Sequence, residues 1–285
     1  METMINIPFV FIESILSHIA VVFTLILFHI HYILLGIFSG IVSGLFGIGG
    51  GMIIVPAMLV LGNSSHYAIA ISVFQMFFAA LFGSYLNYKK KNLNLKDGLF
   101  IGIGGLLGAS CSGMLLQTLS DTILTAIFLL VSCLFFLKYA LGIKEKTSQT
   151  QKNPLQKNII LFFSGIFTGI FAISLGIGGG LLITPLLAYF LGYDSKKVVP
   201  IALFFVIFAS FSGILSLINS GILHSAIIES GIILGLASMV GVFLGIKIIE
   251  KIHIAAHRKF LLCIYIFSII MTSFSLLRKL GILQV

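Results

Sequence analysis

Long uninterrupted apolar stretches occur along this chain from residue 8 to residue 280, separated by short polar breaks. Several of them exceed the ~20 residues that a helix needs to cross the hydrocarbon core of a bilayer. In lipid every backbone amide must be hydrogen-bonded within a helix or a closed barrel, and stretches that are continuous rather than alternating exclude a barrel. Charged residues make up only 9% of the 285 positions, too few to cover a water-soluble domain. The sequence therefore predicts an all-α polytopic membrane protein.

Polar and charged breaks divide the sequence into segments. Residues 1–31 are expected to hold an extra hydrophobic helix at the N-terminal end. A long glycine-rich stretch follows at 32–61, and helices are expected near 66–88, 98–119 and 122–142. Residues 144–157 are polar, contain Pro154 and are interpreted as a linker. Beyond the linker, a second glycine-rich stretch at 158–191 precedes helices near 198–218, 225–249 and 260–280.

The two glycine-rich stretches are related in sequence. At a constant offset of 129 residues, 12 of the 21 positions from 36 to 56 are identical to their counterparts in 165–185. Three apolar segments follow each copy. This pattern predicts an internal duplication into two homologous repeats, residues 32–143 and residues 158–285.

Each copy contains a segment that is a poor helix. A continuous helix over residues 32–61 would be ~45 Å long, well beyond the ~30 Å hydrocarbon core. Four glycines within five residues disfavour it, since each costs about 1 kcal/mol relative to Ala, and a proline fits best in a first turn. We therefore predict in each copy a helix, an unwound segment and a short helix that starts near the proline. The element comprises Gly47, Gly49, Gly50, Gly51 and Pro56 in the first copy and Gly176, Gly178, Gly179, Gly180 and Pro185 in the second.

This duplicated element is the candidate substrate-binding site. Unwound backbone at membrane depth persists only where protein buries it or where it lines a watery cavity, and transporters use such broken helices to bind substrates. Because no Lys or Arg lies in the middle of an apolar segment, backbone N–H groups and helix N-termini would have to bind an anion. The candidate side-chain donors are Ser43, Ser72, Gln75 and Ser174. The alternative interpretation is that the glycines serve close helix packing and the serines bond between helices.

Other partners are not indicated. The net charge of +9 comes from lysine clusters between apolar segments, as in cytoplasmic loops, so no nucleic-acid partner is expected. Two close histidine pairs, at 29/31 and 253/257, lack a third ligand, and the three cysteines stand alone, so neither a metal nor a cofactor is expected. Glu13 and Glu229 are the acids nearest to membrane depth. Without paired acids or an activated nucleophile, the chain is not expected to be an enzyme.

The residues around the glycines resemble a known family. The segments G-L-F-G-I-G-G-G through Pro56 and L-G-I-G-G-G through Pro185 are similar to the signature of the sulfite exporter TauE/SafE family. The order of hydrophobic segments agrees over nearly the whole chain beyond residues 1–30. Where the family often has a small-Thr-Ser pattern, this chain has Ala70-Ile71-Ser72 in one half and Pro200-Ile201-Ala202 in the other. The resemblance implies a multi-pass anion permease of the cytoplasmic membrane.

The expected function is thus secondary transport of a small anion such as sulfite, thiosulfate or an organosulfonate. Its partners would be that anion and the lipid bilayer. A passive anion channel is one alternative, because a sequence does not reveal coupling to another ion. A membrane scaffold or assembly protein that transports nothing is a second alternative, although it would not need two glycine elements.

Two arrangements of the halves are open. If each glycine stretch crosses the membrane, both halves face the same way and the basic regions fall on both sides. If each stretch is a re-entrant hairpin, each half has three spans and the repeats are inverted. The basic regions 89–96, 144–157, 196–197 and 247–259 then share one side, and only residues 278–279 lie on the other. Because positive charge marks the cytoplasmic side, the lysines favour inverted repeats.

Overall fold

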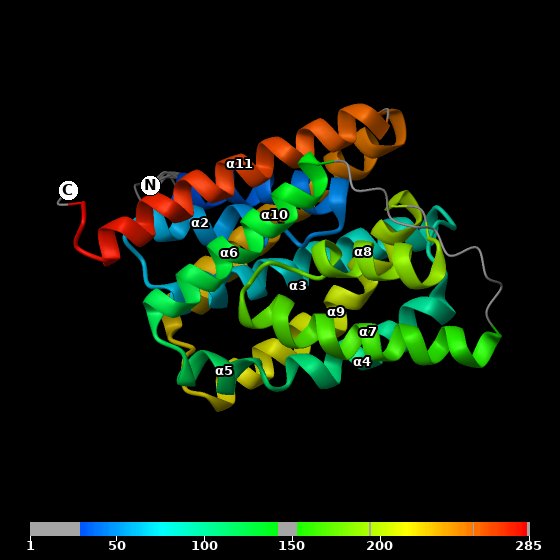
Figure 1. Ribbon diagram of the computed structural model, residues 1–285, viewed down its shortest axis with the longest axis horizontal. Helices are drawn as coiled ribbons and strands as arrows, with labels where there is room; N and C mark the ends of the chain where they lie inside the picture. Colours follow the sequence, from blue (N-terminus) through cyan, green and yellow to red (C-terminus); the bar gives the residue numbers. More distant parts are fainter. Residues whose placement is uncertain (1–28, 142–152, 194, 253, 284–285) are drawn as a thin grey trace, which may run out of the picture.

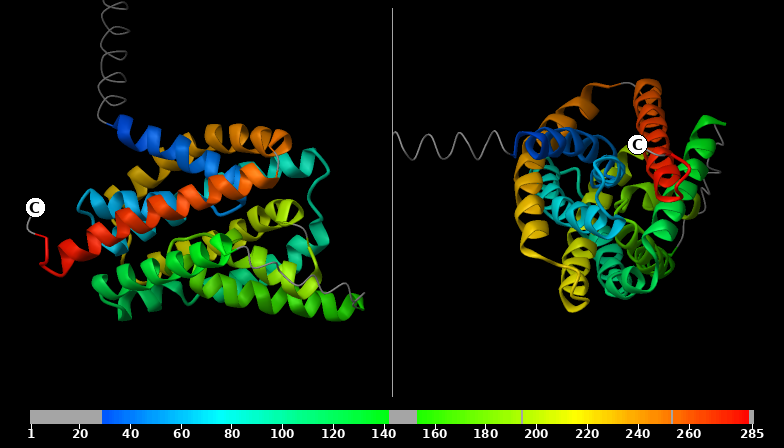
Figure 2. Two further views of the ribbon diagram at one scale, coloured as in Figure 1. Left: turned by 45° about the horizontal axis from the view of Figure 1, so that its top comes forward. Right: turned by 90° about the vertical axis from the view of Figure 1, so that its left-hand side faces the viewer.

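The computed structural model describes residues 29–141, 153–193, 195–252 and 254–283, and this part of the chain is helical and contains no strand. The helices lie side by side along the long axis of the molecule (Figure 1), and a view along that axis shows them nearly end-on (Figure 2). The first described helix is His29–Phe46. It is followed by α2 (Gly51–Val60), α3 (Ser65–Lys89), α4 (Leu95–Ala109), α5 (Ser112–Thr118), α6 (Asp121–Ala140), α7 (Pro154–Ser174), α8 (Gly180–Leu191), α9 (Ser195–Asn219), α10 (Ser225–Lys251) and α11 (Ile254–Lys279).

The predicted fold class is confirmed. Within the described residues, 8 helical stretches are long and apolar enough to cross a membrane, and α2 and α8 are shorter apolar helices. The predicted segment near 98–119 is interrupted, because α4 ends at Ala109 and α5 begins at Ser112. Helix α7 begins at Pro154, inside the expected linker, since proline suits the first position of a helix. The N-terminal helix expected in residues 8–30 and most of the linker lie outside the described residues.

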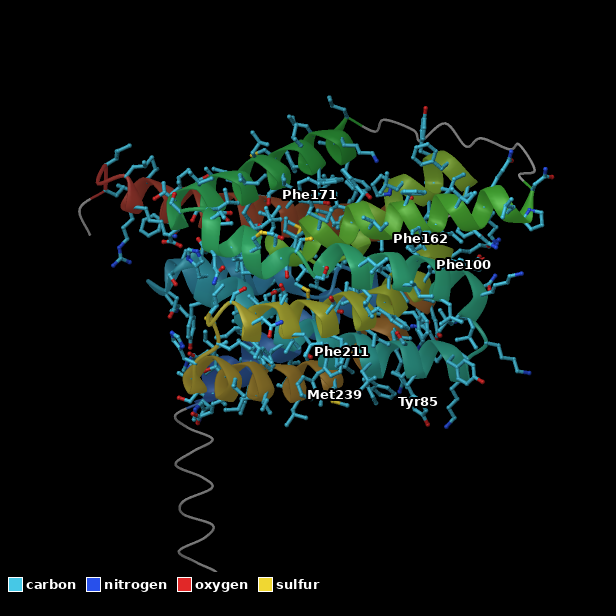
Figure 3. All side chains as sticks on the ribbon, turned by 90° about the horizontal axis from the view of Figure 1, so that it is seen from below. Tyr85, Phe100, Phe162, Phe171, Phe211 and Met239 are labelled. Carbon is cyan, nitrogen blue, oxygen red and sulfur yellow. The ribbon has the colours of Figure 1, made fainter. Side chains whose placement is uncertain are left out.

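The outer surface of the helices is apolar. Tyr85 of α3, Phe171 of α7 and Phe211 of α9, labelled in Figure 3, are each about half exposed, at 57%, 45% and 48%. Extensive exposed apolar surface of this kind is rare on soluble monomers. It is the surface that the acyl chains of a bilayer would cover.

The two ends of the bundle differ in charge. Helices α3, α6 and α10 finish, and α4, α7 and α9 begin, at the end drawn on the right in Figure 1, which we call the lysine-rich end. Its basic residues include Lys89, Lys90, Lys91, Lys96, Lys138, Lys157, Lys197, Lys247, Lys251 and Lys259. At the opposite end, where α3 and α6 begin and α11 finishes, the described basic residues besides histidine are Arg278 and Lys279.

Helices α7 and α8 enter from the lysine-rich end and return to it. Lys157, in the first turn of α7, lies 2.7 Å from a carboxylate oxygen of Asp97 in the first turn of α4. Tyr193, two residues after the end of α8, donates to the other carboxylate oxygen of Asp97 at 2.6 Å. Both outer ends of this helix pair are therefore held at the same end of the molecule.

Helix His29–Phe46 and α2 form the same kind of pair at the opposite end. The imidazole Nε2 of His29 lies 3.6 Å from a carboxylate oxygen of Glu229, near the start of α10. The carbonyl oxygen of Leu59, near the end of α2, accepts from Ser275 Oγ at 3.5 Å, near the end of α11. The turns of the two helix pairs thus point toward each other in the interior.

Glycines let the entering helix of each pair approach a neighbour very closely. A Cβ atom added at Gly36 or Gly44 would lie 2.6 Å from a backbone carbonyl oxygen of α10, and one at Gly40 would overlap α10 backbone as well. Likewise, a Cβ at Gly165 of α7 would overlap a carbonyl oxygen of α4, and one at Gly169 would lie 2.6 Å from another. The bare helix face formed by residues 36, 40 and 44 therefore packs closely against α10.

Candidate functional site

The two glycine motifs, residues 47–51 and 176–180, cross in direct backbone contact. A Cβ at Gly51 would overlap the carbonyl oxygen of Gly176, and a Cβ at Gly180 would overlap the carbonyl oxygen of Gly47. These contacts are reciprocal, because the second pair is the first pair with its positions exchanged at an offset of 129 residues. Near the crossing point, a Cβ at Gly49 would lie 3.6 Å from the Cα of Gly178. Only residues without side chains allow two backbones to come this close.

The predicted unwound segments are confirmed. The first lies between Phe46 and Gly51 and the second between Ser174 and Gly180. The backbone is left-handed at five of these glycines, with φ of 67°, 81° and 83° at positions 47, 49 and 50 and of 64° and 86° at positions 176 and 178. Residues with a Cβ rarely adopt this conformation. Glycine is therefore required in the motifs for two reasons: the left-handed backbone and the close contact between the two motifs.

The motifs present unpaired backbone donors. Neither α2 nor α8 has a side-chain cap at its N-terminus. Within the described part of the chain, no hydrogen bond uses the backbone N–H groups of residues 48–52 or of residues 179–181. Most of these residues are buried, and buried N–H groups in proteins are almost always paired. Two helix N-termini, each with a partial positive charge, thus lie at the crossing point.

The expectation that the short helices start near the prolines is wrong. Helix α2 begins at Gly51 and α8 at Gly180, so Pro56 and Pro185 lie inside the helices, five residues after the start. The left-handed glycine before α2 sets its first turn, whereas the proline removes a single hydrogen bond in the second turn. The prolines are therefore in the helices that flank the crossing point and not at the crossing point itself.

Ser72 joins the two halves. Its hydroxyl, on the fully buried face of α3, donates to the carbonyl oxygen of Gly176 at 2.9 Å. Helices α3 and α9 begin at Ser65 and Ser195, so Ser72 of α3 corresponds to Ala202 of α9. The Cβ of Ala202 lies 3.2 Å from the place that a Cβ at Gly47 would take. Alanine has no hydroxyl to donate. The two sides of the site therefore differ, as the sequence patterns around these residues indicated.

Gln75 lies against the start of α2 without a hydrogen-bond partner. Its side chain is fully buried, and neither its Oε1 nor its Nε2 is paired. A Cβ at Gly50 would lie 2.8 Å from that oxygen and 3.0 Å from that nitrogen. Leaving such an amide unpaired costs about 1–3 kcal/mol. In α9 the corresponding residue is Phe205, which packs against Gly179, so only the first half places a polar group here.

The remaining candidate donors differ in their surroundings. The hydroxyl of Ser43 is fully buried and unpaired, one turn before the first motif. The hydroxyl of Ser174 instead donates to the carbonyl oxygen of Ile170 in its own helix, at 2.6 Å. Thr168, also fully buried and unpaired, was not among the predicted residues. Its alignment with Ser39 at the offset of 129 was the signal that could have found it.

Sequence reasoning also missed the most buried acid of the part of the chain that the structure describes. It singled out Glu229, whose side chain is 65% exposed, whereas that of Asp97 is 3% exposed. Asp97 follows the helix cap Asn94 and pairs with Lys157 and Tyr193. Burial raises the pKa of the Tyr193 hydroxyl, and the hydrogen bond to Asp97 raises it further. The sequence signal was the spacing Asn94-x-x-Asp97, which is typical of a capped helix start.

The described residues include no group of three or more His, Cys, Asp or Glu that could hold a metal ion. A further cluster of charges lies at the end of the bundle opposite the lysine-rich end. There Lys279 Nζ is 2.7 Å from a carboxylate oxygen of Asp121 and 2.8 Å from Thr125 Oγ1. Asp121 also accepts from the backbone N–H of Ser65. The cluster joins α3, α6 and α11 and lies away from the glycine motifs.

Membrane-length helices around two broken, crossing helices define a multi-pass protein of the cell membrane built like a transporter. The sequence profile of the sulfite exporter TauE/SafE family matches residues 32–272, and the chain belongs to this family.

Curated relatives agree with this class. A probable membrane transporter protein of Methanocaldococcus jannaschii is 28% identical over 236 residues, which cover 77% of this chain and 86% of that protein. The probable membrane transporter protein YdhB of Bacillus subtilis is 26% identical over 213 residues, covering 73% of this chain and 85% of that protein. No solved structure gives a significant match. The protein is a membrane transporter.

Proposed function

We propose that the protein is a secondary transporter of a small anion, which binds where the two glycine motifs cross. The observation that carries this proposal is Gln75, a fully buried amide with both polar atoms unpaired, placed against Gly50, the residue directly before α2. A transported ligand would pair with it. The unpaired N–H groups at the starts of α2 and α8 supply further donors for the same ligand.

The chemistry of the site favours an anion over a cation. Helix N-termini and free N–H groups attract negative charge, and they bind it without the strong hold of a buried lysine or arginine. A transporter needs such moderate binding, because its substrate must also leave. Sulfite, thiosulfate and the sulfonate group each carry several acceptor oxygens on a compact centre, which suits donors that converge from two helices. The family to which the chain belongs supports the same substrate class.

We further propose that residues 32–143 and 158–285 act as inverted repeats. The reciprocal contacts of the motifs and the entry of the two helix pairs from opposite ends support this relation. Inverted repeats provide two conformations of similar energy, open to opposite sides, around one central site. The gathering of lysines at one end supports placing that end in the cytoplasm.

Flux measurements on purified protein in liposomes test the proposal. Sulfite, thiosulfate, an organosulfonate and sulfate are offered in turn, with and without proton or sodium gradients, and a Gln75→Glu variant is the control. The carboxylate should abolish flux by repelling an anion. Flux that does not depend on the proton or sodium gradient would identify a passive channel. Absence of flux for every anion would favour a scaffold, and full activity of Gln75→Glu would remove the proposed site.

A further inference from the structure

A cavity of about 270 Å³ opens near the lysine-rich end of the bundle. Its walls come from the ends of helix His29–Phe46, α3 and α10 and from the start of α9. Since a water molecule occupies about 30 Å³ in the liquid, the cavity has room for a small hydrated ion. Gly44 and Val199 form part of the wall, and a Cβ at Gly47 would lie 3.1 Å from the Val199 carbonyl oxygen. Val199 therefore lies between the cavity and the first glycine motif.

The charges around this cavity leave one cation uncompensated. Its charged lining residues are Lys197 and Glu250. Glu250 is neutralised by Lys90, whose Nζ lies 2.6 Å from its carboxylate. Among the described residues, no carboxylate lies within ion-pair distance of Lys197. The amides of Asn87 and Asn92 add neutral polar groups to the wall.

The position that corresponds to Asn87 at the opposite end is apolar and packed. Helices α3 and α9 have equal length, so position 87 corresponds to Leu217 and position 197 to Tyr67. Leu217 is 1% exposed, and α9 is fastened to the α4–α5 junction there through Ser216, whose hydroxyl donates to the Ser110 carbonyl oxygen at 2.7 Å. The polar residue Asn87 and the buried apolar residue Leu217 therefore lie at different ends of the molecule.

We propose that this cavity is the vestibule through which a small anion reaches the first glycine motif from the lysine-rich end, and that Lys197 is the residue that first binds the anion. The inference rests on the proposed anion transport. It assigns to Lys197 a separate, water-exposed binding step before the anion meets the backbone donors. A full positive charge held in a recess with low-dielectric walls raises the local concentration of anions.

Thiol chemistry measures this potential without any transport. In a background with Cys111, Cys133 and Cys263 replaced by serine, Asn87→Cys places a thiol in the cavity wall. Its rates of reaction with the anionic sulfonatoethyl and the cationic trimethylammonioethyl methanethiosulfonate are compared. Asn92→Cys provides a second position in case the first variant folds poorly. Lys197→Gln is then added, with Lys251→Gln as the matched control at the same end.

Lys197→Gln should lower the anionic-to-cationic rate ratio about fivefold, the size expected for one charge at close range in a watery recess, whereas Lys251→Gln should change it less than twofold. Equal ratios with and without Lys197, or thiols that react with neither reagent, would overturn the inference.

In liposomes, Lys197→Gln should raise KM for the anion several-fold and leave maximal flux nearly unchanged. If Gln75→Glu abolishes flux but the thiol rate ratios do not change when Lys197 is replaced, only the proposal of the vestibule is wrong. If the ratios depend on Lys197 but no anion is transported, the proposed function is wrong.

Discussion

Ser72 Oγ donates to the carbonyl oxygen of Gly176 at 2.9 Å, and this bond connects α3 of the first half to the unwound segment of the second. The backbone at Gly176 is left-handed, and a Cβ added there would lie 3.2 Å from the Cα of Ile69 in α3. The hydroxyl therefore fixes the crossing of the two motifs from one side. Ala202, at the corresponding place in α9, provides no such bond.

Replacing Ser72 tests this connection. Ser72→Ala should lower the free energy of unfolding by about 1–2 kcal/mol, because a buried carbonyl oxygen loses its partner. Thermal unfolding in detergent measures the effect. Ser174→Ala is the control, and it should cost less, since the Ser174 hydroxyl donates only within its own helix, to the carbonyl oxygen of Ile170. An unchanged melting temperature in Ser72→Ala would contradict the role of the bond.

Gln75→Met should separate stability from transport. Methionine has nearly the same shape as glutamine but no polar group, so removing the unpaired amide should stabilise the fold by about 1 kcal/mol. Transport should fall at least tenfold, because the ligand loses its side-chain partner. Gln117→Met is the control, since Gln117 is exposed and already donates to the Ser220 carbonyl oxygen at 2.7 Å. Loss of stability in Gln75→Met would show that the amide is structural.

Alanine at three glycines should give three different outcomes. Gly178→Ala should prevent folding, because its Cβ would overlap the Ile48 carbonyl oxygen. Gly49→Ala should fold with reduced transport, since its Cβ would meet the flexible Met76 side chain at 2.9 Å. Gly221→Ala, with φ of 66° and no atom within 4 Å, isolates the backbone strain of about 1–2 kcal/mol. Gel filtration, melting temperature and flux together check this order, which equal stability of all three variants would contradict.

The ion pair of Asp97 should contribute more to stability than an exposed pair. Asp97→Asn should lower the free energy of unfolding by about 1–2 kcal/mol, because Lys157 loses its partner at a partly buried site and the α7–α8 pair loses its attachment to α4. Lys90→Gln, which breaks the more exposed pair with Glu250, should cost less than about 0.5 kcal/mol. Equal losses would show that burial of Asp97 is unimportant.

Cysteine labelling in intact cells tests the orientation of the halves. Asn92 lies between α3 and α4 and Ala256 near the start of α11, both at the lysine-rich end. With an impermeant thiol reagent, Asn92→Cys and Ala256→Cys should both be protected if that end is cytoplasmic. Ser120→Cys, at the start of α6 at the opposite end, should react. Reaction of only one of the first two would support halves that face the same way.

Periodicity and composition were sufficient to predict several of the long helices. Segments near 66–88, 122–142 and 225–249 agree with α3, α6 and α10 to within a few residues, because continuous apolar length is a local property. The break at each glycine motif was equally local, since four glycines in five residues cannot sustain a helix in lipid. Left-handed glycines at positions 50 and 178 precede the starts of α2 and α8, and the prolines come five residues after those starts.

The candidate site required the tertiary structure. The sequence by itself determined a helical membrane protein with two broken helices, since lipid permits few other solutions for such a chain. It also named Ser72 and Gln75, but it could not show that one is bonded to Gly176 and the other is unpaired. Those states depend on contacts between residues far apart in the sequence, as do the crossing of the motifs and the pairing of Asp97 with Lys157. Only the packed structure decides which buried polar groups have partners.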